Sequence, residues 1–363
     1  MSEVSNTAHH STNDLSILQA MAAHGHENVQ FFHDEETGLK AIIAVHDTTL
    51  GPSLGGTRMW PYATEAEALH DVLRLSRGMT YKAAISGLAQ GGGKAVIIGN
   101  SRTDKSEALF RAFGRCVNRM GGSYITAEDV GMDEENMAWV RQETSYVTGL
   151  PQAMGGSGDP SPYTALGVYM SMKASMKYRT GSDSLEGKKI AIQGAGHVAS
   201  YLAKHLQKEG AKLFISDIYD EKAQKLAGDV GAQVVQPEKI LSLAVDILSP
   251  CALGGVINDE TLPDLACELI VGGANNILWD EVSHGQALKD KDILFAPDYV
   301  VNAGGIINIS NEIGGYNPEK ATEQTKAIYY TLLEVFEYAS KKNMTPNLAS
   351  NELVEQRLKA AKK

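Results

Sequence analysis

The sequence predicts a two-domain α/β protein, in which an N-terminal α/β domain precedes a domain built on a doubly wound parallel sheet, with a cleft between them. The chain has 363 residues, more than a single hydrophobic core usually serves. Strand and helix patterns alternate through its second half, which is typical of a parallel sheet covered by helices. Residues 155–162, dense in glycine and proline, interrupt these patterns and predict the hinge between the domains.

We expect the first domain to span residues 1–150 and the second residues 151–342, with a C-terminal helix at 343–363 that joins the first domain. In the first half, the patterns predict a strand at 41–46 and a glycine-rich turn at 51–58. A helix then begins at the capping box of Thr64 and Glu67 and carries Lys82 near its end. A second glycine-rich turn at 90–94 leads into a strand at 95–98, followed by a helix at 104–120 and a strand at 123–126.

The second half continues in strict alternation. Its patterns predict helices at 164–178, 198–209, 318–341 and 345–363, and strands at 188–193, 212–216, 233–235, 246–249, 269–271 and 293–296. Two adjacent glycines, Gly304 and Gly305, indicate a close approach between the backbone and another group.

A glycine-rich loop links the strand at 188–193 to the helix at 198–209. It reads Gly194-Ala195-Gly196-His197-Val198-Ala199-Ser200, and the next strand ends at Asp217. This order of strand, G-x-G-x-x-A, helix, strand and acid is typical of a Rossmann-type unit, in which the loop binds a pyrophosphate and the acid binds the ribose hydroxyls. Because a carboxylate repels a 2′-phosphate, we expect NAD rather than NADP. The alternative for Asp217 is an ordinary turn or cap residue.

Two lysines precede this unit, Lys82 at a predicted helix end and Lys94 at the end of a glycine-rich turn. A lysine that is shielded from water and lies near another cation loses its proton more easily, so Lys94 is a candidate base. Taken alone, a lysine at a helix end is more often a solvated residue that interacts with the helix dipole. Asp129, a further candidate site residue, precedes Val-Gly, where an aspartate taken alone is more often a turn residue.

Composition excludes several classes of partner. The 33 basic and 44 acidic residues leave a formal charge of −11, which argues against a nucleic-acid or anionic-membrane surface and favours a small solute. Three separated cysteines and ten histidines without ligand spacing predict no metal site. Residues 1–13 are polar, and no run approaches about 20 apolar residues, so we expect a soluble, cytoplasmic protein.

The chain resembles the glutamate, leucine, phenylalanine and valine dehydrogenase family, and most of all its leucine dehydrogenase branch. The segments that carry the resemblance occur in the family's order and reach across nearly the whole chain: Leu54 to Met59, Gly78 to Lys82, Gly91 to Lys94, Thr126 to Gly131, Pro250 to Gly254, Ala274 to Asn276 and Asn302 to Gly305.

The resemblance implies reversible, NAD-dependent oxidative deamination of an L-amino acid. In it, Lys82 pairs with the α-carboxylate, Lys94 is the base, and Asp129 passes a proton to the departing ammonia. Thr164 resembles the family threonine that contacts the nicotinamide carboxamide, although a Thr there is also a plain helix start. Asn275 would contact the cofactor and Asn276 the substrate. Asn302 is a candidate partner of the substrate carboxylate, although an Asn before glycines is equally a turn former. The family also implies that the first domain binds substrate and forms a homo-oligomer, either a dimer or an octamer.

Substrate preference follows from two positions. Glutamate-specific relatives carry a lysine before the Gly55-Gly56 pair and a serine in the later pocket segment, where this chain has Leu54 and Ile309. A buried distal carboxylate would be unpaired there, so glutamate should be rejected. With Ala127 and Ile306 the pocket suits leucine, valine or isoleucine. Phenylalanine or tryptophan stays open as an alternative, as does a catalytically silent NAD-binding sensor.

Overall fold

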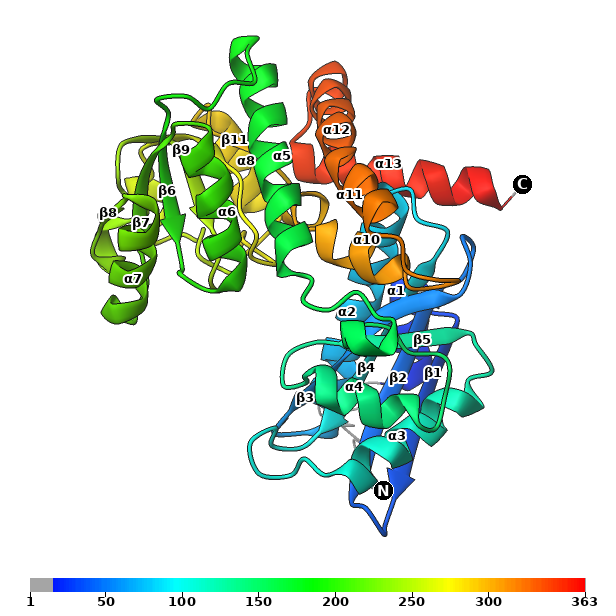
Figure 1. Ribbon diagram of the computed structural model, residues 1–363. Helices are drawn as coiled ribbons and strands as arrows, with labels where there is room; N and C mark the ends of the chain where they lie inside the picture. Colours follow the sequence, from blue (N-terminus) through cyan, green and yellow to red (C-terminus); the bar gives the residue numbers. More distant parts are fainter. Residues whose placement is uncertain (1–15, 363) are drawn as a thin grey trace, which may run out of the picture.

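A computed structural model describes residues 16–362, which form two lobes, each built around its own sheet (Figure 1). The expectation about residues 1–13 lies outside this range. The fold is the expected two-domain α/β architecture. Among the described residues, no helix is long and apolar enough to span a bilayer.

The first lobe holds a five-stranded mixed sheet in the order β1-β2-β4-β3-β5. Only β2 runs against its neighbours, while β4, β3 and β5 are parallel. The strands are β1 (Asn28–Asp34), β2 (Leu39–Asp47), β3 (Ser53–Trp60), β4 (Gly91–Ile98) and β5 (Tyr124–Glu128). The lobe's helices are α1 (Ile17–His24), α2 (Glu65–Ile85), α3 (Glu107–Arg119) and α4 (Glu134–Arg141).

Strand β2 shows why this sheet is covered on both faces. Side chains alternate along a strand, so Ile42 and Ala44 pack with α2 on one face, and Ala41 and Ile43 pack with α3 on the other. A strand with two buried faces is continuously apolar, which is the pattern that predicted it. Strand β1 and helix α4 were not predicted.

The two glycine-rich turns predicted at 51–58 and 90–94 are wrong, because both segments lie mostly in central strands, β3 and β4. A Cβ at Gly55 would lie 1.8 Å from the Gly93 carbonyl oxygen, and one at Gly56 would lie 2.5 Å from that of Glu128. Glycine is needed there because neighbouring backbones approach too closely for a side chain, and not because the chain turns.

The second lobe holds a six-stranded parallel sheet in the order β11-β10-β9-β6-β7-β8. Counted from β6, this is the doubly wound order 3-2-1-4-5-6 read from β8. The strands are β6 (Lys189–Gln193), β7 (Lys212–Ser216), β8 (Gln233–Val234), β9 (Val245–Pro250), β10 (Cys267–Ile270) and β11 (Leu294–Phe295).

Helices cover both faces of this sheet. The helices that follow residue 160 are α5 (Ser161–Thr180), α6 (His197–Lys208), α7 (Asp220–Val230), α8 (Ser283–Asp290), α9 (Asp298–Val301), α10 (Gly304–Ser310), α11 (Pro318–Lys326), α12 (Ile328–Lys342) and α13 (Pro346–Ala361), and the last four pack mainly on other helices. The single helix predicted at 318–341 is two helices that meet at Ala327. Helices α7, α8, α9 and α10 were not predicted.

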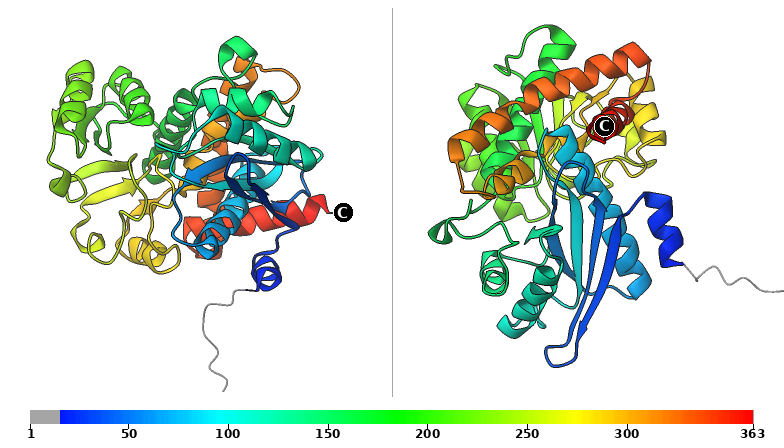
Figure 2. Two further views of the ribbon diagram at one scale, coloured as in Figure 1. Left: turned by 90° about the horizontal axis from the view of Figure 1, so that it is seen from below. Right: turned by 90° about the vertical axis from the view of Figure 1, so that its right-hand side faces the viewer.

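The lobes are joined by the connection that precedes α5 and by helix α13, which packs on both α12 and α2 (Figures 1 and 2). One Arg357 guanidinium nitrogen donates to the carbonyl oxygens of Ala84 and Ile85 at 3.1 and 2.7 Å. Glu312 accepts hydrogen bonds from the backbone N–H groups of Gly149 and Ser157, at 3.0 and 2.9 Å, and so ties the connection to the segment after α10.

Candidate active site

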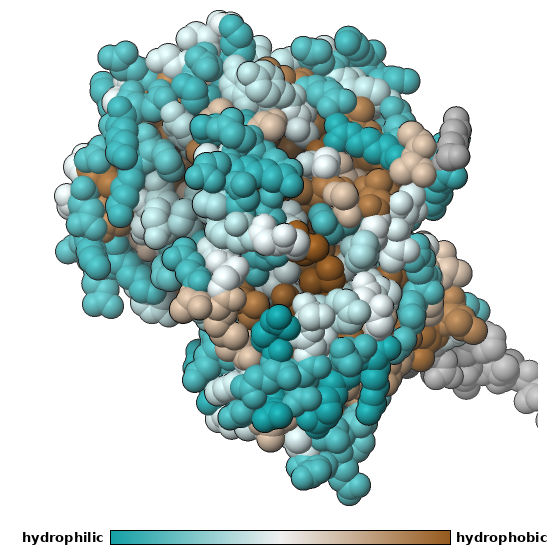
Figure 3. Space-filling model, turned by 45° about the vertical axis from the view of Figure 1, so that its right-hand side comes forward, coloured by the Kyte–Doolittle hydropathy of each residue, from teal (hydrophilic) through white to brown (hydrophobic). Residues whose placement is uncertain are grey.

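A cleft of about 400 Å³ lies between the lobes and gathers most of the predicted site residues. Polar side chains cover both lobes, and apolar side chains gather near the place where the lobes meet (Figure 3). The predicted residues that line the cleft are Gly56, Lys82, Lys94, Ala127, Asp129, Thr164, Val198, Asn275, Asn302, Ile306 and Ile309.

Lys94 and Asp129 form an ion pair in this cleft, with Nζ 2.8 Å from Oδ2. Strand β4 carries Lys94, and Asp129 follows β5; both strands flank β3, and Ala95 and Glu128 both pair with Thr57, so the sheet register brings Lys94 and Asp129 close together. The Arg58 Nε lies 3.3 Å from the same Asp129 oxygen. Burial raises the pKa of Asp129, but the charges of Lys94 and Arg58 outweigh burial and hold this pKa below its ordinary value.

Lys82 lies in the last turn of α2, and its Nζ donates to the Asn275 Oδ1 at 3.3 Å. This amine is partly buried, and it lines both the cleft and an adjoining cavity. Burial lowers the pKa of Lys82 from 10.5 to about 8; the Asp298 carboxylate opposes the shift and the Lys94 charge adds to it. Lys82 is therefore an amine in this cleft whose pKa lies close to neutral pH.

Asn302 presents an unsatisfied acceptor to the cleft. Its Nδ2 donates to the Asn275 Oδ1 at 2.8 Å and to the Gly273 carbonyl oxygen at 3.3 Å, whereas its buried Oδ1 has no partner. A free acceptor pairs with an N–H donor and not with a carboxylate, so the contact with the substrate carboxylate predicted for Asn302 is not the one this geometry supports. A carboxamide or an amine fits this position.

The glycine loop is shaped for a dinucleotide. Gly194 has φ of 104°, and a Cβ at Gly196 would meet no atom within 4 Å, so the space in front of the loop is open. Asp217 accepts a hydrogen bond from the Ala195 N–H at 2.7 Å, which places its carboxylate beside the loop. A pyrophosphate and a ribose fit this arrangement.

The other loop residues have separate roles. The side chain of His197 is 85% exposed, and Ala199 is wholly buried where α6 meets the sheet. Ser200 donates to the Gly196 carbonyl oxygen at 2.9 Å and so stabilises the first turn of α6.

Three predicted substrate residues do not line the cleft. Leu54 is wholly buried in the core beneath it, and Gly55 faces the backbone of Gly93. Asn276, with φ of 52°, lines an adjoining cavity. Strand alternation explains why Gly56 lines the cleft and Gly55 does not, because neighbouring residues on β3 point to opposite faces.

Sequence reasoning missed Arg58 and Glu128. Arg58 bridges two acids, since its Nη1 also lies 2.9 Å from the Asp71 Oδ2. Burial and the nearby carboxylates of Glu134 and Asp159 raise the pKa of Glu128 to about 7 at the cleft wall. Both residues lie inside motifs that were identified. Glu128 directly precedes Asp129 in the sequence, which was the signal that could have found it, whereas Arg58 meets Asp129 only in the folded structure.

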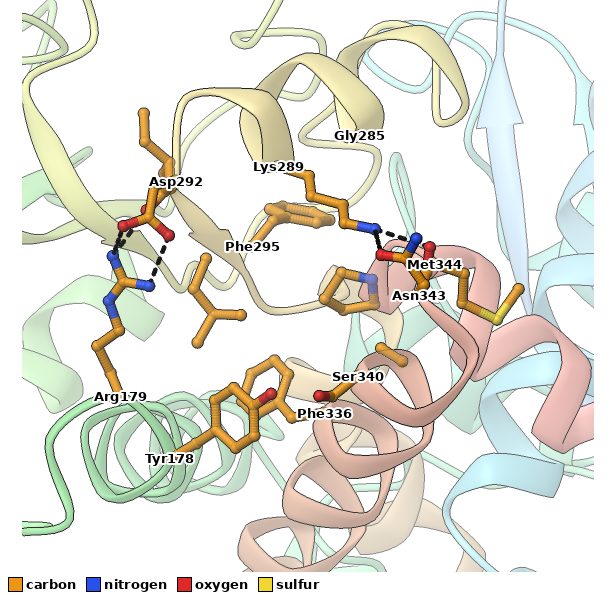
Figure 4. A pocket seen from close by; sticks show the side chains of 14 residues that line it. Tyr178, Arg179, Gly285, Lys289, Asp292, Phe295, Phe336, Ser340, Asn343 and Met344 are labelled. Carbon is orange, nitrogen blue, oxygen red and sulfur yellow. Dashed lines mark hydrogen bonds and ion pairs between the residues drawn. The ribbon is translucent and has the colours of Figure 1, made fainter.

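Another cavity of about 260 Å³, between α5, α8 and α12, contains none of the predicted site residues (Figure 4). Its charged side chains pair with their neighbours: Arg179 donates to Asp292 at 2.9 Å, and Lys289 to the Asn343 Oδ1 at 2.9 Å. These contacts tie helices together, and no buried charge there awaits a ligand.

Sequence comparison covers nearly the whole chain. Residues 26–146 match the family described as "Glu/Leu/Phe/Val dehydrogenase, dimerisation domain", and residues 155–220 and 215–363 match "Glutamate/Leucine/Phenylalanine/Valine dehydrogenase". The chain belongs to this dehydrogenase family. It is therefore an amino-acid dehydrogenase.

Individual members of the family align over nearly the whole chain. A leucine dehydrogenase of Thermoactinomyces intermedius is 51% identical over 349 residues, covering 96% of this chain and 95% of that protein. An L-tryptophan dehydrogenase of Nostoc punctiforme is 47% identical, covering 96% and 98%.

Solved structures agree on the fold. The crystal structure of L-tryptophan dehydrogenase from Nostoc punctiforme superimposes with a TM-score of 0.85 at 46% identity, over 96% of this chain and 100% of that one. A hetero-hexameric glutamate dehydrogenase from Thermus thermophilus superimposes with a TM-score of 0.76 at 22% identity, covering 95% of this chain and 94% of that one; it supports the fold alone.

Proposed function

We propose that the protein catalyses the reversible, NAD-dependent oxidative deamination of a branched-chain L-amino acid to the 2-oxo acid and ammonia. The observation that carries the proposal is the ion pair of Lys94 and Asp129, which lines one cleft together with Lys82, Thr164 and Asn302. When bound, NAD supplies the acceptor for the Cα hydride.

The roles of the protein's own groups follow from charge and position. The Lys82 ammonium binds the α-carboxylate and orients Cα. The substrate ammonium takes over part of the contact between Asp129 and Lys94, and it gives one proton to Asp129 as Cα loses its hydride. Lys94, once it has released its own proton to solvent, accepts a proton from the water that adds to Cα. Asp129 then returns its proton to the departing amine. Asn302 Oδ1 takes the donor that it lacks, an amide of the cofactor or the substrate amine.

The apolar end of the cleft supports an aliphatic substrate. Ala127, Ile306 and Ile309 line it, and none of them can pair with a distal carboxylate. Met79 and Met132 complete this wall. Since leucine and tryptophan dehydrogenases are both similar to this chain, an aromatic substrate is the second candidate. The complete set of proton-transferring groups argues against a silent sensor.

A substrate panel tests the proposal. We expect NADH formation with leucine, valine and isoleucine, with kcat/KM at least roughly tenfold above that for phenylalanine, tryptophan or glutamate, because a pocket contact of one or two methylenes is worth about 1–3 kcal/mol. Preference for an aromatic substrate would transfer the assignment to the second candidate. Binding without turnover of any amino acid would establish a sensor.

The choice of NAD depends on Asp217. Replacing Asp217 by asparagine should raise kcat/KM with NADP relative to NAD by roughly tenfold, because the amide removes the charge that repels a 2′-phosphate. Asparagine retains an oxygen that accepts from the Ala195 N–H, so the loop keeps its anchor. Asp217→Ala, which removes both the charge and the accepting oxygen, is the comparison variant. An unchanged cofactor ratio in both variants would remove Asp217 from the cofactor site.

We further propose a homo-oligomer, a dimer or an octamer, in a cytoplasmic setting. Edge strand β1 carries Phe31 with 49% of its surface exposed, within the segment that matches the family's dimerisation domain. All three cysteines are free thiols, which is the usual state of cysteine in a reducing compartment such as the cytoplasm. Light scattering on the purified protein distinguishes two subunits from eight.

A further inference from the structure

Deamination requires small molecules to move while larger ones stay bound. In each turnover, the amino acid, NAD⁺ and water yield the 2-oxo acid, ammonium, NADH and one proton. Water must reach Cα and ammonia must leave it while the amino acid and the nicotinamide fill the cleft. This inference therefore rests on the proposed function.

A second cavity, of about 300 Å³, reaches the same reacting groups from another side. It meets the cleft at Met79, Lys82, Lys94, Asp129 and Asn275, which line both. A water molecule takes about 30 Å³ in the liquid, so the cavity has room for several.

Its other walls come from different elements. They belong to α2, to Arg58 of β3, to the segment that begins at Asn276, to α9 and to α13, and none belongs to the glycine loop. Arg74, on its wall, leaves 47% of its side chain exposed, which places one end of the cavity at the surface. The lining is largely polar, including Arg77 and Glu281, so water wets it.

The cavity also lies beside direct contacts between the lobes. The rings of Tyr81 in α2 and Tyr299 in α9 meet edge to face, 6.5 Å apart, and the Tyr81 hydroxyl donates to Glu355 of α13 at 3.2 Å. The cavity therefore lies on the side of the cleft where the lobes are already packed together.

We propose that this second cavity is the port through which water reaches Cα and ammonia leaves it during turnover. Water and ammonia are small enough for it and need only hydrogen-bonding walls. The amino acid enters by the cleft, which carries the apolar residues that its side chain needs.

Gly78 offers a way to narrow the port without replacing a reacting group. It lines the cavity from the interior of α2, and a Cβ there meets no atom within 4 Å. We expect Gly78→Leu to raise the KM for ammonium in the reductive direction roughly tenfold and to lower kcat in both directions, because access and release then limit the rate. The KM for the 2-oxo acid and the affinity for NADH should stay unchanged.

Gly228 is the matched control. It also lies inside a helix, α7, and a Cβ there likewise meets no atom within 4 Å, so Gly228→Leu makes the same change in helix propensity away from the cavity. Its kinetics should equal those of the unmodified protein. Gly78→Ala, which favours the helix, should show the same selective rise in the KM for ammonium at a smaller size.

Two results would overturn the port. One is a KM for ammonium that stays the same in Gly78→Leu and Gly228→Leu. The other is an equal rise in the KM for the 2-oxo acid, which would mean that leucine disturbs Lys82 one helical turn away. Failure of the unmodified protein to turn over any amino acid would overturn the proposed function and the port with it, and this result is distinct from both.

Discussion

Replacing Lys94 by alanine should lower kcat by roughly a thousandfold, since a positioned proton-transfer group contributes about 10² to 10⁴ in rate. No other amine takes its place, because Lys82 is held by Asn275 and serves the carboxylate. Steady-state NADH formation measures the loss, and fluorescence titration with NADH should show that the cofactor still binds.

Lys105→Ala is the control for removing a lysine from an ion pair, since its Nζ lies 2.7 Å from the Asp133 Oδ2 outside the cleft. It should keep full turnover, because surface pairs contribute little. In Lys94→Ala, Asp129 keeps Arg58 as its partner, so the fold should survive and thermal unfolding can verify it. If Lys94→Ala retained most of its turnover, the assignment of Lys94 as the base would be wrong.

Replacing Lys82 by methionine should raise the KM for the amino acid roughly a hundredfold, because a charge-assisted contact contributes about 1.5–3 kcal/mol and each 1.4 kcal/mol is tenfold. Methionine retains the apolar stem without the charge. Cofactor affinity should be unchanged, since Lys82 lies outside the glycine loop. An unaltered KM would exclude Lys82 as the carboxylate partner.

The same amine predicts a dependence on pH. With its pKa lowered to about 8, Lys82 is cationic below that pH and increasingly neutral above it. Binding of a carboxylate should therefore weaken as pH rises through 8. A competitive 2-hydroxy acid, which has no amino group of its own to titrate, isolates this effect through its inhibition constant. Lys82→Arg should remove this dependence on pH, because arginine stays charged. An inhibition constant that does not vary from pH 7 to 9 in the unmodified protein would contradict the assignment of Lys82 as the carboxylate partner.

The sequence predicted the second lobe well because its signals are local. The loop from Gly194 to Ala199, the helix after it and the acid at Asp217 are read within one βαβ unit, and each follows from short-range geometry. Lys82 near a helix end was predicted for the same reason, since Thr64 caps the helix. Arg58 was missed because its two acidic partners are distant in sequence.

What the sequence by itself determined is therefore the fold class, the dinucleotide loop and the set of reacting residue types. The tertiary structure decided how those residues meet. It placed the glycines of β3 and β4 inside a sheet, because their tolerance for close backbone approach appears only when strands pack. It paired Lys94 with Asp129, gave Lys82 the lowered pKa and left the Asn302 oxygen without a donor. Burial and the distance between charges set these properties, and both depend on residues far apart in the chain.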